Sequence, residues 1–338
     1  GEALPAIVQQ LKTVPYLSEI VIGLDRASAD EYKHALSFFA DLPQHHRIMW
    51  HDGPRLSAID AELQALNLAP HQAGKGRNVW YCMGYILASG KAESIALHDC
   101  DITTYSTELL ARLIYPVANP MFNYEFCKGY YARVAGGKMN GRVNRLLITP
   151  LLRALKSVMG PSDYLDYMDS FRYSLAGEFS FRRDVLNDIR IPSDWGLEIA
   201  DIYDHKHQDL SSDDQHSGLS KMSIDISKAL FRKLATKGTV FSPEHFRSIK
   251  ATYYRIALDF VETYRNDAVM NGLQFDIHQE EASVEMFARN IMDAGQAFLD
   301  NPMETPFIPS WNRVQSALPD IFERIYQAVE EDYQEFSA

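Results

Sequence analysis

Apolar runs and amphipathic segments alternate along roughly the first 115 residues of the chain. Three short, mostly apolar runs are typical of buried strands: residues 19–24, 47–51 and 94–98. The spacing of apolar positions between them predicts helices, one of which is opened by Ser28 and one of which covers residues 75–87. This alternation predicts an α/β fold with a mostly parallel sheet and helices on both faces, in which ligands bind at the carboxyl ends of the strands.

The rest of the chain has a different pattern. The middle third is irregular and is punctuated by glycines such as Gly141, so an acceptor site could be built there. From about residue 222 onward the apolar spacing is helical, and Ser242-Pro243-Glu244 has the signature of a helix start. We expect these helical stripes to form the core or a homodimer interface.

Composition narrows the function classes. The 338 residues carry a net charge of −12, which argues against binding to nucleic acids or to anionic membranes, because such affinity requires Lys and Arg to neutralise phosphates. No run of 18 apolar residues is present, so no transmembrane span is expected. The first residues lack the features of a secretory signal, and three cysteines cannot form a paired framework. The expected location is the cytoplasm.

One stretch departs from this acidic balance. Residues 121–155 contain a single acid, Glu125, and six bases: Lys128, Arg133, Lys138, Arg142, Arg145 and Arg153. An acidic protein with one basic stretch can use it to bind a small anion. A solvated basic helix face is the alternative interpretation.

The triplet Asp99-Cys100-Asp101 directly follows the third apolar run. Carboxylates at positions i and i+2 leave a strand end on the same side, where both can approach a hard divalent cation such as Mg²⁺ or Mn²⁺. A solvated acidic pair is the alternative, because a chain with 45 acids produces such pairs by chance. Cys100, between two carboxylates, is expected to be a poor nucleophile.

Two other motifs carry candidate ligands. Gly74-Lys75-Gly76 places a lysine at the entrance of a predicted helix, which suits an anionic group such as a diphosphate. His205 and His207 lie two residues apart, so that in an extended segment they share a face and either could complete a metal site. An exposed lysine in a glycine turn and a surface histidine pair are the alternatives.

In their order along the chain, these motifs resemble glycosyltransferase family 81. The matching pieces are Gly74-Lys75-Gly76, Asp99-Cys100-Asp101, residues 126–131, Gly141-Arg142-Val143-Asn144, residues 150–152, 175–178 and 196–199, and His205-Lys206-His207. Each piece is short, but together they span residues 74–222 in one order. The resemblance implies a GT-A-type (Rossmann-like) fold and a retaining transfer of glucose from a nucleotide diphosphate sugar, with UDP-glucose the expected donor, to 3-phospho-D-glycerate.

The resemblance also implies roles for individual residues. For the donor and the metal they are Lys75, Gly74 and Asp25 as donor contacts, Asp99 beside the sugar or ribose, and Asp101 and His205 as metal ligands. For the acceptor they are the loop Gly141, Arg142, Val143 and Asn144 around the phosphate, with Lys128 and His207 near it. Glu198 is expected near the sugar or the acceptor hydroxyl, as a catalytic residue together with Asp99.

Three regions are expected on this basis. Residues 1–120 would form the nucleotide-sugar half, 121–222 the acceptor half, and 223–338 a helical extension. Compared with the family, a first strand is expected to be missing before Gly1, and about a helix and a strand between Ala200 and Asp201.

Other functions stay open at this point. A retaining transferase that uses mannose or another acceptor has the same motifs, since no residue reads the configuration at C2 of the sugar. A sugar nucleotidyltransferase shares the sheet and the acidic metal site, but it would require a long glycine-rich phosphate loop that is absent. A non-enzymatic oligomerisation protein with a degenerate nucleotide fold is the fourth possibility.

Overall fold

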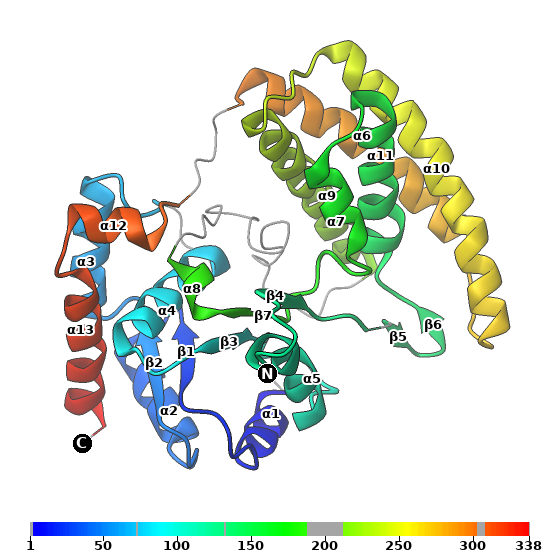
Figure 1. Cartoon of the computed structure of the whole chain (residues 1–338). Coiled ribbons are helices and arrows are strands. Elements are labelled where there is room, and N and C mark those ends of the chain that lie inside the picture. The colour runs from blue at the N-terminus through cyan, green and yellow to red at the C-terminus, as the bar shows by residue number, and fades with distance from the viewer. Residues whose placement is uncertain (1–2, 72–73, 132, 188–211, 303–307, 338) are drawn as a thin grey trace. The chain divides into compact units, whose positions relative to one another are not determined.

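The computed structural model describes residues 3–71, 74–131, 133–187, 212–302 and 308–337, and the side chains of all of these except 212–218. The chain divides into two compact units (Figure 1). Unit 1 comprises Gly1–Gly129, Gly177–Leu197 and Thr305–Ala338, and unit 2 comprises Tyr130–Ala176 and Glu198–Glu304. These boundaries differ from the three predicted regions, because residues 121–129 and 305–338 both pack with the N-terminal part of the chain.

Unit 1 contains the predicted alternation of strands and helices. Its strands are β1 (Ile20–Leu24), β2 (His46–Trp50), β3 (Ser94–Leu97), β4 (Phe126–Lys128) and β7 (Phe179–Arg182). Its helices are α1 (Ala3–Leu11), α2 (Ala29–Phe39), α3 (Pro54–Ala65), α4 (Lys75–Ser89), α5 (Thr107–Ala118), α8 (Arg183–Leu186), α12 (Trp311–Ala317) and α13 (Ile321–Phe336). Ser28 opens α2 with a full capping box to Glu31, as its sequence predicts. The α/β class is therefore confirmed.

The described strands of unit 1 pair in two separate groups. β1 and β2 are parallel, with Ile22 opposite Ile48, as predicted. β3 instead pairs antiparallel with β7, which also pairs antiparallel with β4, giving the order β3-β7-β4. β3 thus belongs to an antiparallel group separate from the parallel pair, and its partner β7 comes from about 80 residues further along the chain. No other described strand pairs with the second edge of β1 or with that of β3.

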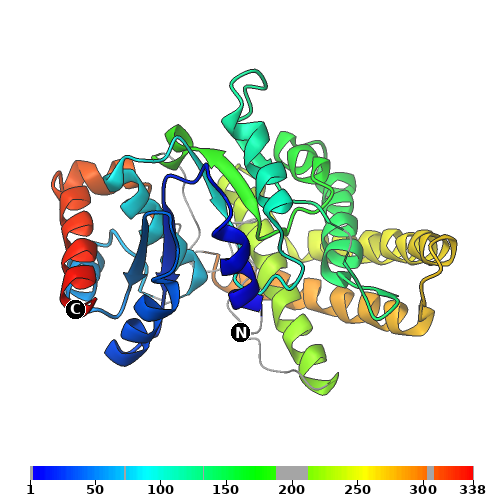
Figure 2. The same ribbon diagram turned by 90° about the horizontal axis from the view of Figure 1, so that it is seen from below.

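The core of unit 1 lies around α4. Trp80 of this helix stacks on Trp311 of α12, with ring centroids 4.1 Å apart. Gly84 is required there, since a Cβ at this position would lie 2.4 Å from the Trp311 ring. Helix α13 packs on α3, α4 and β2 (Figures 1 and 2), so the end of the chain completes a core that its first hundred residues begin.

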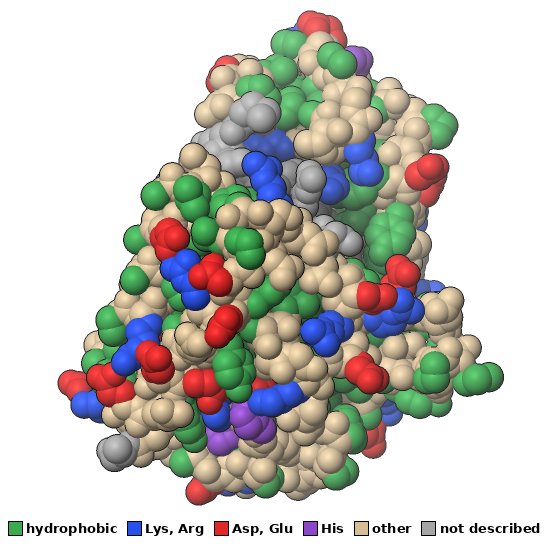
Figure 3. Space-filling view, turned by 60° about the vertical axis from the view of Figure 1, so that its left-hand side comes forward, with side chains coloured by type: hydrophobic (Ala, Val, Ile, Leu, Met, Phe, Trp, Pro, Cys, Tyr) green, Lys and Arg blue, Asp and Glu red, His purple; other side chains and the backbone are tan. Residues whose placement is uncertain are grey.

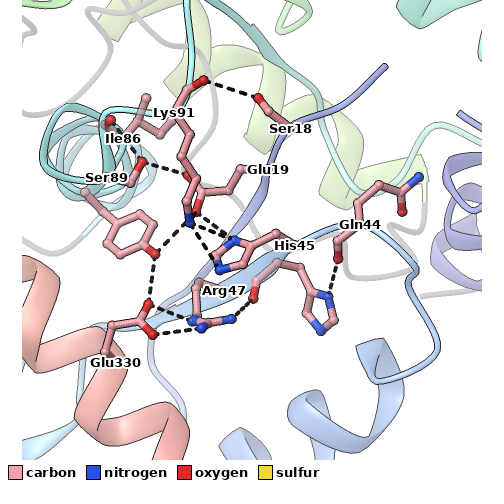
Figure 4. Close-up of polar contacts among 11 residues, drawn as sticks. Ser18, Glu19, Gln44, His45, Arg47, Ile86, Ser89, Lys91 and Glu330 are labelled. Carbon is pink, nitrogen blue, oxygen red and sulfur yellow. Dashed lines mark hydrogen bonds and ion pairs between the residues drawn. The ribbon is translucent and has the colours of Figure 1, made fainter. Parts of the chain in front are cut away.

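A network of charged and polar side chains fixes α13 at the amino-terminal ends of β1 and β2 (Figure 4). Arg47 of β2 donates from Nε and Nη2 to the two carboxylate oxygens of Glu330, both at 2.7 Å. Beside it, Glu19 lies 3.0 Å from His45 and 3.2 Å from Lys91. This network is at the opposite end of the strands from Asp25, and its members are paired with one another, so it stabilises the fold rather than forming a ligand site.

Unit 2 is mainly helical. Its helices are α6 (Thr149–Met159), α7 (Asp163–Ser170), α9 (Ser212–Thr236), α10 (Pro243–Met270) and α11 (Ile277–Asp300), and it also holds a short π-helix η1 (Val143–Ile148) and the hairpin strands β5 (Val134–Ala135) and β6 (Lys138–Met139). Ser242 caps α10, with Pro243 at the first turn, which confirms the predicted helix start. None of the helices in the described part of the chain is both long and apolar enough to span a membrane.

The predicted apolar stripes pack inside unit 2. Tyr253 of α10 and Val284, Phe287 and Ile291 of α11 are fully buried. The core interpretation is therefore confirmed for these four residues. In the lower half of the face shown in Figure 3, Lys and Arg side chains lie beside Asp and Glu side chains.

Candidate active site

Lys75 and Asp99 meet at the carboxyl end of β3. Lys75 is the first residue of α4, and its Nζ donates to Oδ1 of Asp99 at 2.6 Å. Their side chains are only 19% and 16% exposed, so water screens this ion pair little. Gly74 caps α4 in an extended conformation (φ 174°) that any residue adopts, so the glycine is not needed for the backbone geometry.

The pair lines a cavity of 370 Å³ in unit 1, between β1 and β3. Gly23, Asn78, His98 and Cys100 also line this cavity, most of whose remaining wall is apolar. Desolvation, and then the charges of Asp99 and Asp101, raise the pKa of the Cys100 thiol, so it is a poor nucleophile, as its sequence predicts.

Asp25 follows β1 but does not line this cavity. Arg77 of α4 lies between two carboxylates, with Nη2 3.3 Å from Oδ1 of Asp25 and Nη1 3.2 Å from Oδ2 of Asp60. Tyr81, one turn further along α4, donates its hydroxyl to Asp60 at 2.6 Å. Asp25 is therefore held against α4 beside the Lys75 site, with a side chain that is 10% exposed.

Asn78 connects the cavity to a buried histidine. A Cβ on Gly23 would lie 1.8 Å from Oδ1 of Asn78, so β1 and α4 can approach this closely only because position 23 is glycine. The same Oδ1 lies 3.2 Å from Nε2 of His51. Burial lowers the pKa of His51, against smaller opposing effects of Asp25 and Asn78.

This lowered pKa predicts a pH dependence of stability. Above about pH 6.5 His51 is neutral in both states, but below it the unfolded chain takes up a proton that the native imidazole resists. The wild type should therefore lose more unfolding free energy between pH 7.5 and 5.5 than His51→Gln does, as urea denaturation at both pH values would measure. Equal losses in the two proteins would mean that native His51 has an ordinary pKa.

Of the two predicted metal ligands, only Asp101 lies within the described residues. Asp101 lies in the turn after β3 with an exposed side chain, two residues from Asp99. Within the described ranges, no three His, Cys, Asp or Glu side chains lie close enough together to hold a metal ion. The two carboxylates alone match the demand of Mg²⁺, which keeps several waters and is bound by one or two carboxylates plus substrate phosphates. His205, the second predicted ligand, lies outside the described residues.

The predicted acceptor loop lies in unit 2. Gly141 has φ +78°, a conformation that favours glycine, and η1 begins two residues later. Val143 is 9% and Asn144 6% exposed. The Asn144 side-chain amide donates to the carbonyl of Arg172 at 3.2 Å, so this side chain points into unit 2. Of the four loop residues, Arg142 has the most accessible polar group.

The guanidinium of Arg142 is held by two residues of α11. Its Nε donates to Oε1 of Glu280 and its Nη2 to Oε1 of Gln279, both at 2.6 Å. Glu280 lies 138 positions further along the chain, and no local pattern connects the two. These contacts, like those of Arg77, were not predicted from the sequence, although Arg77 directly follows the Gly74-Lys75-Gly76 motif.

The remaining predicted site residues lie in unit 1 or outside the described residues. Lys128 ends β4 in unit 1, where its Nζ lies 5.4 Å from the centre of the Phe179 ring. Lys128 thus belongs to unit 1, whereas Arg142 belongs to unit 2. Glu198 and His207 lie outside the described residues.

Comparisons with known proteins give a consistent result. The chain is 43% identical over 352 residues to the glucosyl-3-phosphoglycerate synthase of Persephonella marina, covering 98% of this chain and 87% of that one. It is 38% identical over 358 residues to that of Methanococcoides burtonii, with the same coverage. No protein-family model matches. The crystal structure of mannosyl-3-phosphoglycerate synthase from Rubrobacter xylanophilus aligns at 18% identity over 71% of this chain and 72% of its own, with a TM-score of 0.46, too weak a likeness to carry a conclusion.

Proposed function

The chain belongs to the family of glucosyl-3-phosphoglycerate synthases, and from this premise we propose that it transfers glucose from a nucleotide diphosphate glucose to 3-phosphoglycerate. Within the structure, the observation that supports this function best is the Lys75–Asp99 pair at the start of α4 and the end of β3. A cation and a carboxylate meet there on a cavity wall, at the strand end where α/β folds bind nucleotides.

The donor diphosphate is proposed to bind at the start of α4. The unpaired N–H groups of a first helical turn and the helix dipole both favour a phosphate there, and Lys75 adds a full positive charge. When the diphosphate takes Lys75 as its partner, Asp99 is released to contact the sugar or ribose. Gly74 allows the backbone to approach the phosphates, and Asp25 is proposed as a contact for the base or ribose.

Asp101, with His205, is proposed to hold a divalent cation. When bound, this ion would stabilise the negative charge of the departing nucleoside diphosphate. Mg²⁺ and Mn²⁺ both suit an oxygen-rich site of this kind. UDP-glucose is the proposed donor, and a homodimer the proposed assembly.

The acceptor is proposed to bind through Gly141, Arg142, Val143 and Asn144, with contributions from Lys128 and His207. A planar guanidinium binds a phosphate through two parallel hydrogen bonds, which fix its orientation as well as adding affinity. The transfer is proposed to retain the configuration of the anomeric carbon. If the leaving phosphate guides attack on its own face of the sugar, Glu198 and Asp99 position reactants and no carboxylate nucleophile is needed.

Incubation with Mg²⁺, UDP-glucose and 3-phosphoglycerate tests the proposal. We expect a product with the mass of a glucosylated phosphoglycerate, and an α-anomeric proton by NMR, since the donor is an α-glucoside. Parallel reactions with GDP-mannose, ADP-glucose and unphosphorylated glycerate define the sugar, the base and the need for the acceptor phosphate. Absence of product from every pair of donor and acceptor would refute the proposal.

A further inference from the structure

Glu280 is a buried carboxylate without an assigned role. It lies in the first turn of α11 and is 3% exposed. Its Oε1 accepts from Nε of Arg142, and its Oε2 lies 3.0 Å from Nη2 of Arg145. One buried acid thus contacts two of the six bases in the stretch from residue 121 to 155, both within unit 2.

The second of these arginines is itself fixed. Arg145 donates from Nε to the carbonyl of Asn140 at 3.0 Å, and its guanidinium lies 4.8 Å from the centre of the Tyr264 ring. Its own side chain is 9% exposed. Glu280 is therefore held by a rigid partner on one oxygen, and it can fix Arg142 through the other.

Arg142 retains the pair of donors at the outer end of its guanidinium. A guanidinium has five N–H groups, one on Nε and two on each Nη. Glu280 takes the Nε donor and Gln279 takes one on Nη2, and these two lie on the same edge of the plane. No described residue takes the other three, which are on Nη1 and Nη2. One N–H of Nη1 and one of Nη2 point outward in parallel, as required to bind a phosphate through two hydrogen bonds, and the third, on Nη1, lies on the opposite edge.

From this geometry we infer that Glu280 is the positioning residue for the acceptor phosphate, holding Arg142 by its Nε edge so that its Nη end meets the phosphate. The inference rests on the proposed function, because it takes the phosphate of 3-phosphoglycerate as the ligand of Arg142. Glu280 acts through Arg142 and does not touch the substrate.

Charge and orientation make opposite predictions for Glu280→Gln. By charge alone, removing an acid between two arginines would strengthen phosphate binding and lower the KM for 3-phosphoglycerate. If Glu280 positions Arg142, this KM should instead rise by about tenfold, because a charge-assisted hydrogen bond that orients the guanidinium is lost. We expect kcat and the KM for the donor to stay within about threefold, since neither depends on this contact.

The matched control is Glu281→Gln, which neutralises the next residue of α11, whose side chain is 46% exposed. It should leave both KM values unchanged. Gln279→Ala removes the other contact to Arg142, from an exposed position, and should raise the acceptor KM by a smaller factor. This variant tests the inference if Glu280→Gln fails to fold.

A double-mutant cycle separates positioning from a general structural role. In an Arg142→Ala background, Glu280→Gln should cause no further rise in the acceptor KM. Full additivity, or an unchanged or lowered KM in the single variant, would overturn the inference while leaving the proposed function standing. A wild-type protein that neither converts 3-phosphoglycerate nor binds it in calorimetric titration would overturn both.

Discussion

Replacing Asp101 by alanine is expected to lower kcat/KM for glucosyl transfer by about a thousandfold, or ~4 kcal/mol of transition-state stabilisation. The side chain follows β3 in a turn beside Asp99, where the proposed divalent cation would offset the charge that develops on the departing diphosphate. Activity should be measured at increasing Mg²⁺, together with the affinity for Mn²⁺ by paramagnetic resonance.

The control for Asp101→Ala is Glu108→Ala, which removes an exposed carboxylate of α5 that pairs only with Arg112 among the described residues. It should keep wild-type activity and Mn²⁺ affinity. If Asp101→Ala binds Mn²⁺ as tightly as the wild type, Asp101 is not a ligand and the acidic triplet needs another explanation.

Replacing Arg142 by alanine is expected to raise the KM for 3-phosphoglycerate by roughly 10- to 150-fold, which corresponds to about 1.5–3 kcal/mol for charge-assisted hydrogen bonds to a phosphate. The Arg142 side chain is only 24% exposed, so its contacts to an anion are weakly screened by water. Steady-state kinetics with each substrate varied in turn would measure this, and the KM for the donor should not change.

Arg153→Ala is the matched control for Arg142→Ala. Arg153 lies in the same basic stretch, but its side chain is 50% exposed and it contacts Asp169 and the Phe260 ring. An equal rise in acceptor KM in both variants would indicate a diffuse attraction by the whole stretch. An unchanged KM in Arg142→Ala would place the acceptor phosphate elsewhere.

The features that could be predicted from the sequence are those fixed by short-range patterns. The runs at 19–24 and 47–51 form a parallel pair, because each is apolar and is followed by a helix that returns the chain to the same edge. Ser28 and Ser242 cap helices because a hydroxyl at the first position accepts a backbone N–H three residues later. Lys75 at a helix start and Asp99 at a strand end were both predicted as contacts for the donor, although their pairing with each other was not.

The features that could not be predicted depend on contacts between distant segments. Nothing near residues 94–97 indicates that β7 would pair antiparallel with them. In the sequence, the stretch from residue 121 to 155 has an unbalanced positive charge. The carboxylate that pairs with Arg142 and Arg145 in the structure lies far along the chain, on α11. The sequence predicts α12 and α13 to be part of a C-terminal helical extension. In the structure they belong to unit 1, where Trp311 packs on Trp80 and Glu330 pairs with Arg47.

The place of α13 in unit 1 has a consequence for synthesis of the protein on the ribosome. The second segment of unit 2 lies between Arg183, where α8 begins, and Ile321, where α13 begins. At a translation rate of about 5–20 residues per second, Ile321 is added roughly 7–28 s after Arg183. Throughout that interval the nascent chain displays Trp80 and Arg47 without the partners that later cover them. Unit 1 can therefore reach its final state only after unit 2 has been translated, so emergence of α12 and α13, rather than of the first strands, sets the earliest moment at which its core can be complete.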